Sequence, residues 1–540
     1  VTIPTSSLAA RIGTASALAI ALCVPQTAQA RARTHVSPYL EVDQTVIADI
    51  KGGSGDVLTY SSVAVGVDAS VQTQRAEATI DLRYEHQFGW NKHSADSDLI
   101  SGIASARYQI TPQTLSIEGG ALATRVRTDG FTGANGSLAS AGSNHTNVYS
   151  LYAGPTLTTH VGELSVNAAY RLGYSRVEDD VSVTLPGGPA LDSFGDSTFH
   201  SITASVGMQP GHLPFGWTLS AGYDREDASQ LDQRYEDKWA RADVTVPVSR
   251  TVAAVGGVGY EAIKISARDA LRDGLGNPVV DGGGRFVTDP ASPRMLAYDS
   301  DGLIWDVGVL WRPSRRTSLE ARIGHRYGGM QYFGSFAWTP DSRSSFGVAV
   351  YSSIDSFGRA LLHNLDGLPG SFTAHRNPFS GDLTGCVQGD QSGGQCFNDT
   401  LSGITTANYR HRGISAQYAR NAGPLNWGVG LGYSQRKFLV PNSGVLAALN
   451  GTKDENYYGD VFAGYAIDPV STLQGDVYVN VFNAGVTGFD VTNIGSYVTY
   501  TRTFGQRLSA NASLGIDSVK AQDIEAIISA LGQVGLRYQF

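Results

Sequence analysis

The feature that most constrains this chain is an alternation of apolar and polar residues, which recurs from Ser37 to the C-terminus. Successive side chains of a β-strand point to opposite faces, so each such stretch predicts a strand with one apolar and one polar face. The clearest example is RLSANASLGID, residues 507–517. Its apolar face holds Leu508, Ala510, Ala512, Leu514 and Ile516, and its polar face holds Arg507, Ser509, Asn511, Ser513 and Asp517.

Short and long connections alternate between these predicted strands. Turns such as TPQ and FGQ are short, whereas longer loops are expected near 129–145, 178–198, 268–300, 356–403 and 439–454. Short turns on one rim and long loops on the other are typical of an outer-membrane barrel. We therefore expect an all-β fold over residues 31–540. It is a single large closed antiparallel transmembrane β-barrel of about 22 strands, within a range of about 16 to 22, and it has no plug domain.

Composition and hydropathy favour the same fold. Charged residues make up 16% of the chain, below the roughly 25% of soluble domains. No apolar run of about 18 residues follows the first thirty positions, which argues against a transmembrane helix in the mature protein. In hydrocarbon every backbone N–H and C=O needs a partner within the protein, so a spanning sheet must close on itself.

Residues 1–30 are expected to be a secretory signal peptide. Arg11 is the only charged residue, an apolar stretch follows from Ala15 to Val24, and Ala28 and Ala30 form a small-residue cleavage site. The alternative is a buried N-terminal helix. We predict cleavage after Ala30, and hence export through the periplasm.

Charge and cysteine content limit the possible ligands. The formal net charge of −9 excludes a basic nucleic-acid binder. Two cysteines remain in the mature chain, Cys386 and Cys396, and in an exported protein we expect them to form a disulfide, with two free thiols as the alternative. Two cysteines are too few for the usual zinc sites, so we expect no metal and no cofactor.

The last strand carries an assembly signal. Val534, Leu536, Tyr538 and Phe540 alternate on one face, and the chain ends on the aromatic Phe540. This pattern resembles the C-terminal signal of Gram-negative outer-membrane β-barrels. The resemblance implies insertion into the cell outer membrane by the barrel-assembly machinery, with contacts to membrane lipid and lipopolysaccharide.

A narrower resemblance involves FGRALLHNLDGLPGSFTAHRNPFSGDLTGC (357–386) and ANYRHRG (407–413). These stretches look like a group of porin-like bacterial barrels. Some of that group are labelled preprotein translocase subunit YajC, and others are similar to barrels tied to exopolysaccharide export. The YajC label fits poorly, because that subunit is a small protein with one apolar helix.

The parity of the strands assigns charges of both signs to the lumen. Such charges either set the ion preference of an aqueous channel or pair across strands and solvate the lumen. The predicted lumen charges are Glu77, Asp81, Arg83, Glu85, Arg107, Arg241, Asp243, Asp306, Arg312, Glu320, Arg322, Arg326, Asp460, Asp476, Arg507, Asp517 and Arg537.

The loop 356–403 is the longest, and a loop of that length is usually functional or disordered. It could fold into the barrel and narrow it, or it could cap the outer mouth. The loop 268–300 mixes carboxylates, arginines and glycines without the spacing of a known Ca²⁺ repeat, so we expect a solvated loop there.

We expect no enzyme. Gly195, Asp196 and Ser197, with His200 nearby, give only a partial match to the nucleophile block of some lipases. A protease of the omptin kind would need Asp and His at the outer rim. His86, His93 and Asp96 do not distinguish such a site from a polar loop. An outer-membrane hydrolase is thus a minor alternative.

The TonB-dependent transporter is a rival because it has about 22 strands. It needs a plug ahead of the barrel, and only Arg31 to Ser37 separate the expected cleavage site from the first strand. We therefore expect a porin-like channel for a small polar solute. The alternative is a barrel component of an exopolysaccharide or surface-protein export system, with a polysaccharide as its cargo.

Overall fold

The computed structural model describes residues 33–540 with several gaps. The residues outside the description are 1–32, 53–56, 91–95, 128–144, 179–182, 185–189, 192–193, 282–284, 375, 382, 384–385, 390–394, 402, 486–489 and 523–524. The expected signal peptide and its cleavage site lie outside the described residues. Among the described residues, no helix has the length and apolarity needed to cross a membrane.

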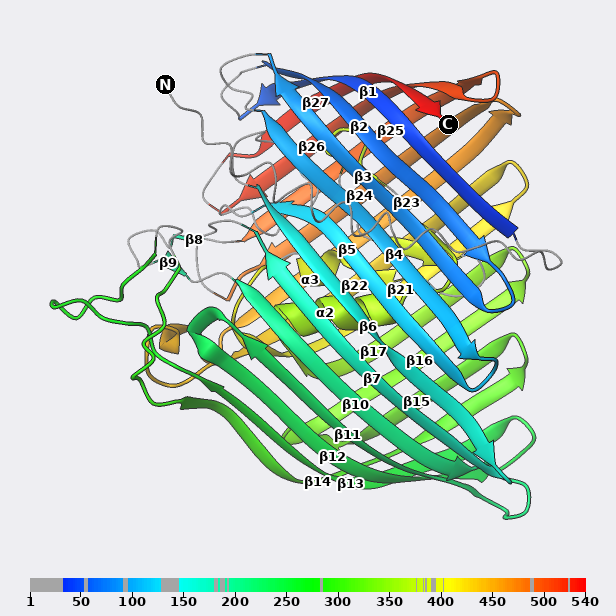
Figure 1. Cartoon of the computed structure of the whole chain (residues 1–540), viewed down its shortest axis with the longest axis vertical. Coiled ribbons are helices and arrows are strands. Elements are labelled where there is room, and N and C mark those ends of the chain that lie inside the picture. The colour runs from blue at the N-terminus through cyan, green and yellow to red at the C-terminus, as the bar shows by residue number, and fades with distance from the viewer. Residues whose placement is uncertain are drawn as a thin grey trace.

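Within the described residues, 22 antiparallel strands form one closed sheet (Figure 1). Each strand pairs with its neighbours in the chain, and the first strand also pairs with the last, with Leu40 opposite Tyr538. The strands are β1 (Arg33–Lys51), β2 (Val57–Gln72), β3 (Ala76–Gly89), β4 (Ser97–Thr111), β5 (Leu115–Arg127), β6 (His145–Val161), β7 (Leu164–Val177), β10 (Asp196–Met208), β11 (Gly216–Ala228), β12 (Gln233–Pro247), β13 (Val252–Ala267), β14 (Met295–Ser314), β15 (Thr317–Arg326), β16 (Gly329–Asp341), β17 (Ser344–Asp355), β21 (Asn408–Ala422), β22 (Leu425–Leu439), β23 (Lys453–Asp468), β24 (Ser471–Asn483), β25 (Val491–Phe504), β26 (Leu508–Ala521) and β27 (Ile527–Gln539).

Smaller elements lie in the connections. Two short strands, β8 (Val183–Thr184) and β9 (Ala190–Leu191), pair with each other, and the 3-10 helices η2 (Gln230–Asp232) and η3 (Ala447–Leu449) lie in other loops. The connection between β17 and β21 holds α2 (Phe357–Asp366), β18 (Phe372–Thr373), β19 (Cys386–Gly389), β20 (Gln395–Cys396) and α3 (Asn398–Leu401).

The two faces of the sheet differ as alternation requires. On β1, Leu40 and Val42 are exposed on the outside, whereas the intervening Glu41 and Asp43 are buried on the inside. Leu514 on β26 is 73% exposed, as a residue in contact with lipid would be. Because the sheet has no free edge and its outer face is apolar, the protein is a β-barrel of the outer-membrane type.

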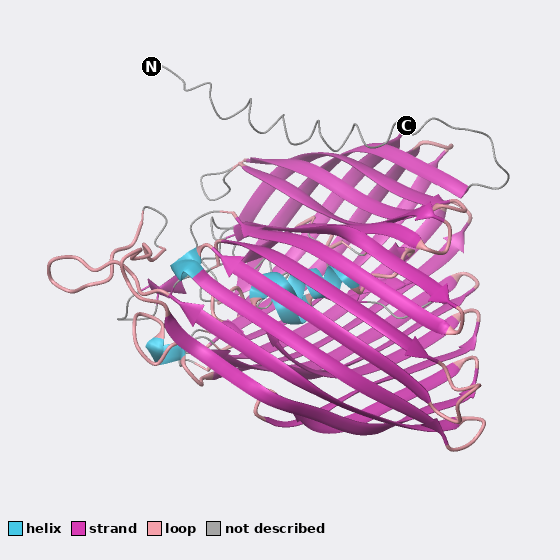
Figure 2. Cartoon of the chain, turned by 60° about the horizontal axis from the view of Figure 1, so that its bottom comes forward, coloured by secondary structure: helices cyan, strands magenta, loops and turns pink. Residues whose placement is uncertain are grey.

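The expected all-β closed barrel of about 22 strands is confirmed, whereas the expectation that it has no plug is wrong. We call residues 356–407 the lumen segment, because α2 and its neighbours lie inside the barrel (Figure 2). Helix α2 contacts the inner faces of β5, β6, β7 and β10. The physical reason is an apolar helix face and an apolar patch on the inner wall, which remove each other from water.

Candidate functional site

Helix α2 begins at an anchor between the lumen segment and the wall. Ser356 caps the helix: its Oγ accepts a hydrogen bond from the backbone N–H of Arg359 over 3.1 Å and donates to the Glu226 carboxylate. The Arg359 guanidinium lies 2.8 Å from Glu226 Oε2, and both side chains are 2% exposed. The same guanidinium lies 3.6 Å from the centroid of the Tyr235 ring. A buried ion pair of this kind is costly to break, because the remaining charge stays buried.

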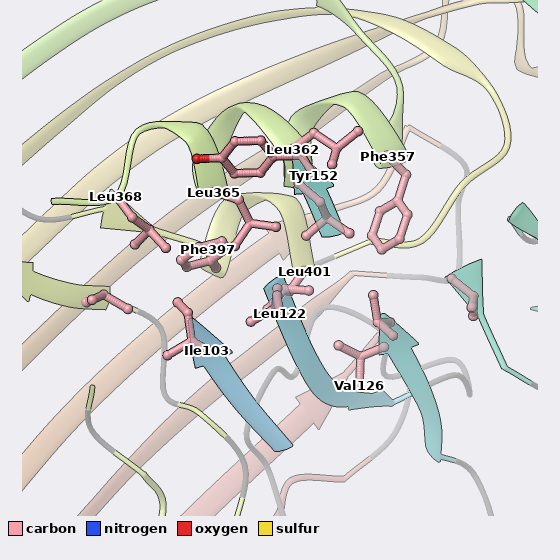
Figure 3. Packing of buried hydrophobic residues seen from close by; sticks show 14 of the residues in the cluster. Ile103, Leu122, Val126, Tyr152, Phe357, Leu362, Leu365, Leu368, Phe397 and Leu401 are labelled. Carbon is pink, nitrogen blue, oxygen red and sulfur yellow. The ribbon is translucent and has the colours of Figure 1, made fainter. Parts of the chain in front are cut away.

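An apolar core joins α2 to the wall of the barrel (Figure 3). The helix supplies residues at a spacing of three to four, which places them on one face. The wall supplies inward residues of β4 to β7 and of β10. The buried cluster consists of Ile103, Leu122, Val126, Val148, Tyr152, Val177, Phe194, Phe199, Phe357, Leu361, Leu362, Leu365, Leu368, Phe372, Val387, Phe397 and Leu401.

Beyond α2 the lumen segment is held by hydrogen bonds to its backbone carbonyls. Gln533 Nε2 donates to the carbonyl of Pro378 over 2.6 Å, and Tyr60 Oη donates to that of Phe379. Ser101 Oγ donates to the carbonyl of Gly381 over 3.0 Å. Because β27 pairs with β1 and β1 pairs with β2, these three hydrogen bonds lie along one arc of the closed wall.

The predicted loop 356–403 therefore folds into the lumen. Cys386 and Cys396 face each other in register across β19 and β20. Their side chains lie outside the described residues, so the disulfide stays a prediction.

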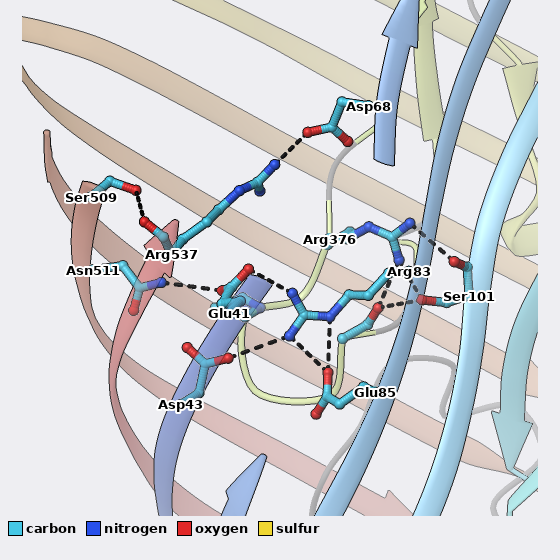
Figure 4. A network of polar contacts seen from close by, with 12 residues as sticks. Glu41, Asp43, Asp68, Arg83, Glu85, Ser101, Arg376, Ser509, Asn511 and Arg537 are labelled. Carbon is cyan, nitrogen blue, oxygen red and sulfur yellow. Dashed lines mark hydrogen bonds and ion pairs between the residues drawn. The ribbon is translucent and has the colours of Figure 1, made fainter. Parts of the chain in front are cut away.

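The arginine Arg83 is the centre of a buried charge network (Figure 4). Its guanidinium lies 2.7 Å from Glu41, 3.3 Å from Asp43 and 2.8 Å from Glu85. Carboxylates outnumber the guanidinium here, which leaves this part of the inner wall acidic.

A cavity of about 540 Å³ lies between this network and the opposite wall. We call it the chamber. Its lining includes Asn426 and Arg537, which lie close to the short-turn rim, and residues 372–374 and 376–378 of the lumen segment. Short turns face the periplasm in outer-membrane barrels, so the chamber occupies the periplasmic half of the lumen.

The other arginines of the chamber are also paired. Arg376 of the lumen segment binds Asp81, and Arg537 binds Asp68. The Arg537 guanidinium lies 3.5 Å from the centroid of the Tyr39 ring. Each of these two arginines of the chamber is therefore paired with one carboxylate.

A second cavity of about 390 Å³ separates α2 from β17 and β21. His363 of α2 projects toward it, with Nδ1 3.3 Å from Asp355 Oδ1 and a side chain 56% exposed to the cavity. His411 Nδ1 lies 3.8 Å from Asp355 Oδ2. Burial within the barrel lowers the pKa of His363, but the hydrogen bond and charge of Asp355 outweigh it and hold that pKa above its ordinary value.

A second network of predicted lumen charges lies on β12 to β15. Arg241 and Arg322 both bind Asp306, and Arg322 Nε also lies 2.6 Å from Glu320. Asp243 bridges the same two arginines. Charges of opposite sign thus pair across neighbouring strands, which is one of the two roles considered from the sequence.

The remaining predicted charges are dispersed. Arg326 pairs with Glu261, and Arg107 is exposed and pairs with Glu118. Arg507 lies in a turn outside the strands. Arg312 is exposed near the end of β14 that leads into a short turn. The other positions are Glu77 beside Gly370 of the lumen segment, Asp517 accepting from Tyr478 Oη, and the neighbouring carboxylates Asp460 and Asp476.

Several residues of the site were not among the predicted ones. Glu41 and Asp43 alternate with apolar residues on β1, and the parity used elsewhere would have found them. Glu226 lies on β11 in a run of four charged residues, 224–227, so the parity does not single it out. Arg359 and Arg376 had no such signal, because they belong to a connection whose path the alternation does not define.

No protein-family model matches the sequence, and no curated protein does. Solved structures match over most of the chain. The open form of the ferric-catecholate import receptor Fiu from E. coli K12 has a TM-score of 0.47 at 9% identity, covering 93% of this chain and 81% of that chain. The FrpB iron transporter from Neisseria meningitidis (F5-1 variant) has a TM-score of 0.45 at 10% identity, with 93% and 82% covered. The siderophore receptor PirA from Acinetobacter baumannii has a TM-score of 0.41 at 9% identity, with 95% and 81% covered.

The expectation of a porin-like channel is corrected. The physical reason lies in the protein itself, because the lumen segment occupies part of the barrel interior, where α2 packs in an apolar core against the wall. The narrower resemblance to exopolysaccharide-associated and YajC-labelled barrels, and the export role based on it, are not supported either.

Proposed function

We propose that the protein is an outer-membrane receptor and transporter that is selective for a small ligand, with the lumen segment as its barrier. One observation carries the proposal: a buried ion pair and a large apolar core hold the segment against the inner wall. A docked barrier keeps passive solutes out, and a specific ligand then crosses only when the segment moves.

The chamber supports selectivity. Its volume of about 540 Å³ falls within the roughly 300–1,000 Å³ of small-molecule sites. The arginines in it are fixed by ion pairs, and one of them belongs to the lumen segment, so a ligand meets an ordered surface. We propose that this surface, and not a ring of free charges, discriminates between ligands.

The remaining features fit this role. We propose that residues 1–30 direct export through the periplasm and that Val534, Leu536, Tyr538 and Phe540 direct insertion by the barrel-assembly machinery. Lipid and lipopolysaccharide would then surround the apolar outer face.

Liposome swelling with sugars of graded size tests the barrier. Wild-type protein is expected to give little swelling with any sugar. Asp355 is paired with Tyr409 across β17 and β21, so a short Gly-Ser turn can replace residues 357–407 without moving the strands. That variant is expected to admit small sugars rapidly.

The control is the Leu514→Ala variant, which alters only the lipid face. It should swell as slowly as the wild type. Rapid, size-graded swelling with the wild type would show an open channel and overturn the proposal. Equal swelling of the wild type and the turn variant would also do so.

A further inference from the structure

One carboxylate of the chamber has aromatic residues as its partners on both neighbouring strands. Asp476 of β24 lies directly opposite Phe462 of β23 on one side and Tyr497 of β25 on the other. All three residues line the chamber. Asp476 is only 7% exposed, so its carboxylate is buried at the wall and directed into the cavity.

Asp476 has no counterion within the described part of the chain. No hydrogen bond or ion pair reaches its carboxylate, and the charged group that acts on it is a second carboxylate, Asp460. The Oδ1 atom of Asp460 also has no hydrogen-bond partner among the described residues. An unpaired buried carboxylate is costly in its charged form, so such a group is either neutralised by a proton or paired with a cation that enters the cavity.

The arginines of the chamber do not supply that charge. Arg83 binds three carboxylates, Arg376 binds Asp81, and Arg537 binds Asp68. This leaves the wall around Asp476 negative and open to a cation from the cavity.

We propose that Asp476, supported by Asp460, binds the ammonium group of a small organic cation in the chamber, and that Phe462, which lines the same chamber, adds a ring contact to that cation. The assignment rests on the proposed function, since it names the class of ligand that the chamber takes. A carboxylate beside aromatic faces suits an ammonium group, because both the charge and the ring quadrupole attract it. Arg537 over the Tyr39 ring shows the same geometry elsewhere in the chamber.

The site does not suit a metal ion. Hard cations such as Ca²⁺ take about six to eight oxygen ligands. Among the described residues, no group of three potential metal ligands converges.

Isothermal titration of the purified full-length protein in detergent tests the assignment. The probe is choline, and 3,3-dimethylbutan-1-ol is its neutral isostere. Wild-type protein is expected to bind choline saturably and to give no saturable binding of the neutral isostere. Asp476→Asn and Phe462→Leu are each expected to weaken choline binding at least about tenfold, the effect of one lost charge or ring contact.

Asp517→Asn is the matched control. It makes the same chemical change on the neighbouring wall, but Asp517 does not line the chamber and its carboxylate accepts from Tyr478 Oη. Its affinity for choline should equal that of the wild type. Heat-modifiable migration on gels confirms that each variant is a folded barrel.

Several outcomes would overturn the assignment. These are equal binding of the neutral isostere, wild-type affinity in the folded Asp476→Asn variant, and displacement of choline by Na⁺ or Ca²⁺ at comparable concentrations. If Asp476→Asn does not fold, the isostere comparison and Phe462→Leu still decide. This experiment measures binding without transport. If choline does not bind, the ligand assignment fails and the barrier proposal is unaffected. If wild-type liposomes swell rapidly, the barrier proposal fails and the choline measurement is unaffected.

Discussion

Arg359 of the lumen segment and Glu226 of β11 form an ion pair of 2.8 Å inside the barrel, where each side chain is 2% exposed. The two residues are far apart in the sequence, and the pair fixes the start of α2 against the wall. Since the pair is shielded from water, it differs from surface ion pairs, which contribute little to the free energy of folding.

Removing one partner is expected to release the lumen segment. Arg359→Met leaves the Glu226 carboxylate buried without its charge partner, a change that costs about 3–5 kcal/mol. The measurement is protease cleavage within residues 356–407, which should become faster. The double variant Arg359→Met with Glu226→Gln should recover much of the resistance, because no uncompensated charge remains. Equal cleavage of the single and double variants would show that the charges do not dock the segment.

The apolar contacts of α2 are expected to hold the segment but not the barrel. Leu365 is fully buried against the wall, and Leu365→Ala is expected to cost about 2–5 kcal/mol of docking free energy. Liposomes with this variant should pass small sugars faster, while its heat-modifiable gel migration stays that of the wild type. Leu514→Ala, on the lipid face, is the control. A loss of barrel migration in Leu365→Ala would mean that the segment is needed for the barrel itself.

The sequence predicts the wall better than the contents of the barrel. Alternation places Leu514 outside and Asp517 inside, because lipid and a polar lumen impose opposite demands on successive residues. The same rule does not predict the inward orientation of Ile103 and Leu122, because both residues are apolar. Such strands look apolar on both faces, and only the docked helix explains them.

A local signal for α2 was nevertheless present. Ser356 precedes a run in which Phe357, Leu361 and Leu365 recur every four residues, which is the pattern of a capped amphipathic helix. Period and cap predict a helix but not where it docks. The position depends on long-range contacts such as Arg359 with Glu226, which no local pattern specifies.

The final strand is expected to govern assembly. Phe540 is 68% exposed and lies edge-on to Tyr538, with ring centroids 5.1 Å apart. Because it contributes little buried area, its removal should leave the folded barrel stable. We predict that deleting Phe540 lowers the amount of protein in the outer membrane several-fold, as measured by immunoblotting of membrane fractions. The purified variant should melt at the wild-type temperature. A wild-type membrane level would contradict the assembly role.

The contact between His363 and Asp355 makes docking of α2 depend on pH. The pKa of His363 in the folded protein is raised above its ordinary value of 6.5, so the protonated histidine stabilises docking at low pH. That contribution is complete below pH 6.5 and is lost as pH rises through the higher folded value.

Hydrogen exchange of the α2 backbone amides measures this effect. After correction for intrinsic rates, protection should fall as pH rises above about 6.5, the ordinary histidine pKa. His363→Gln should remove the pH dependence and leave the exchange of β26 unchanged, because that strand lies outside the contacts of α2. His200→Gln is the control for the loss of a histidine, because the His200 ring contacts Tyr170 and not Asp355. If His363→Gln kept the full pH dependence, another group would control the docking of α2.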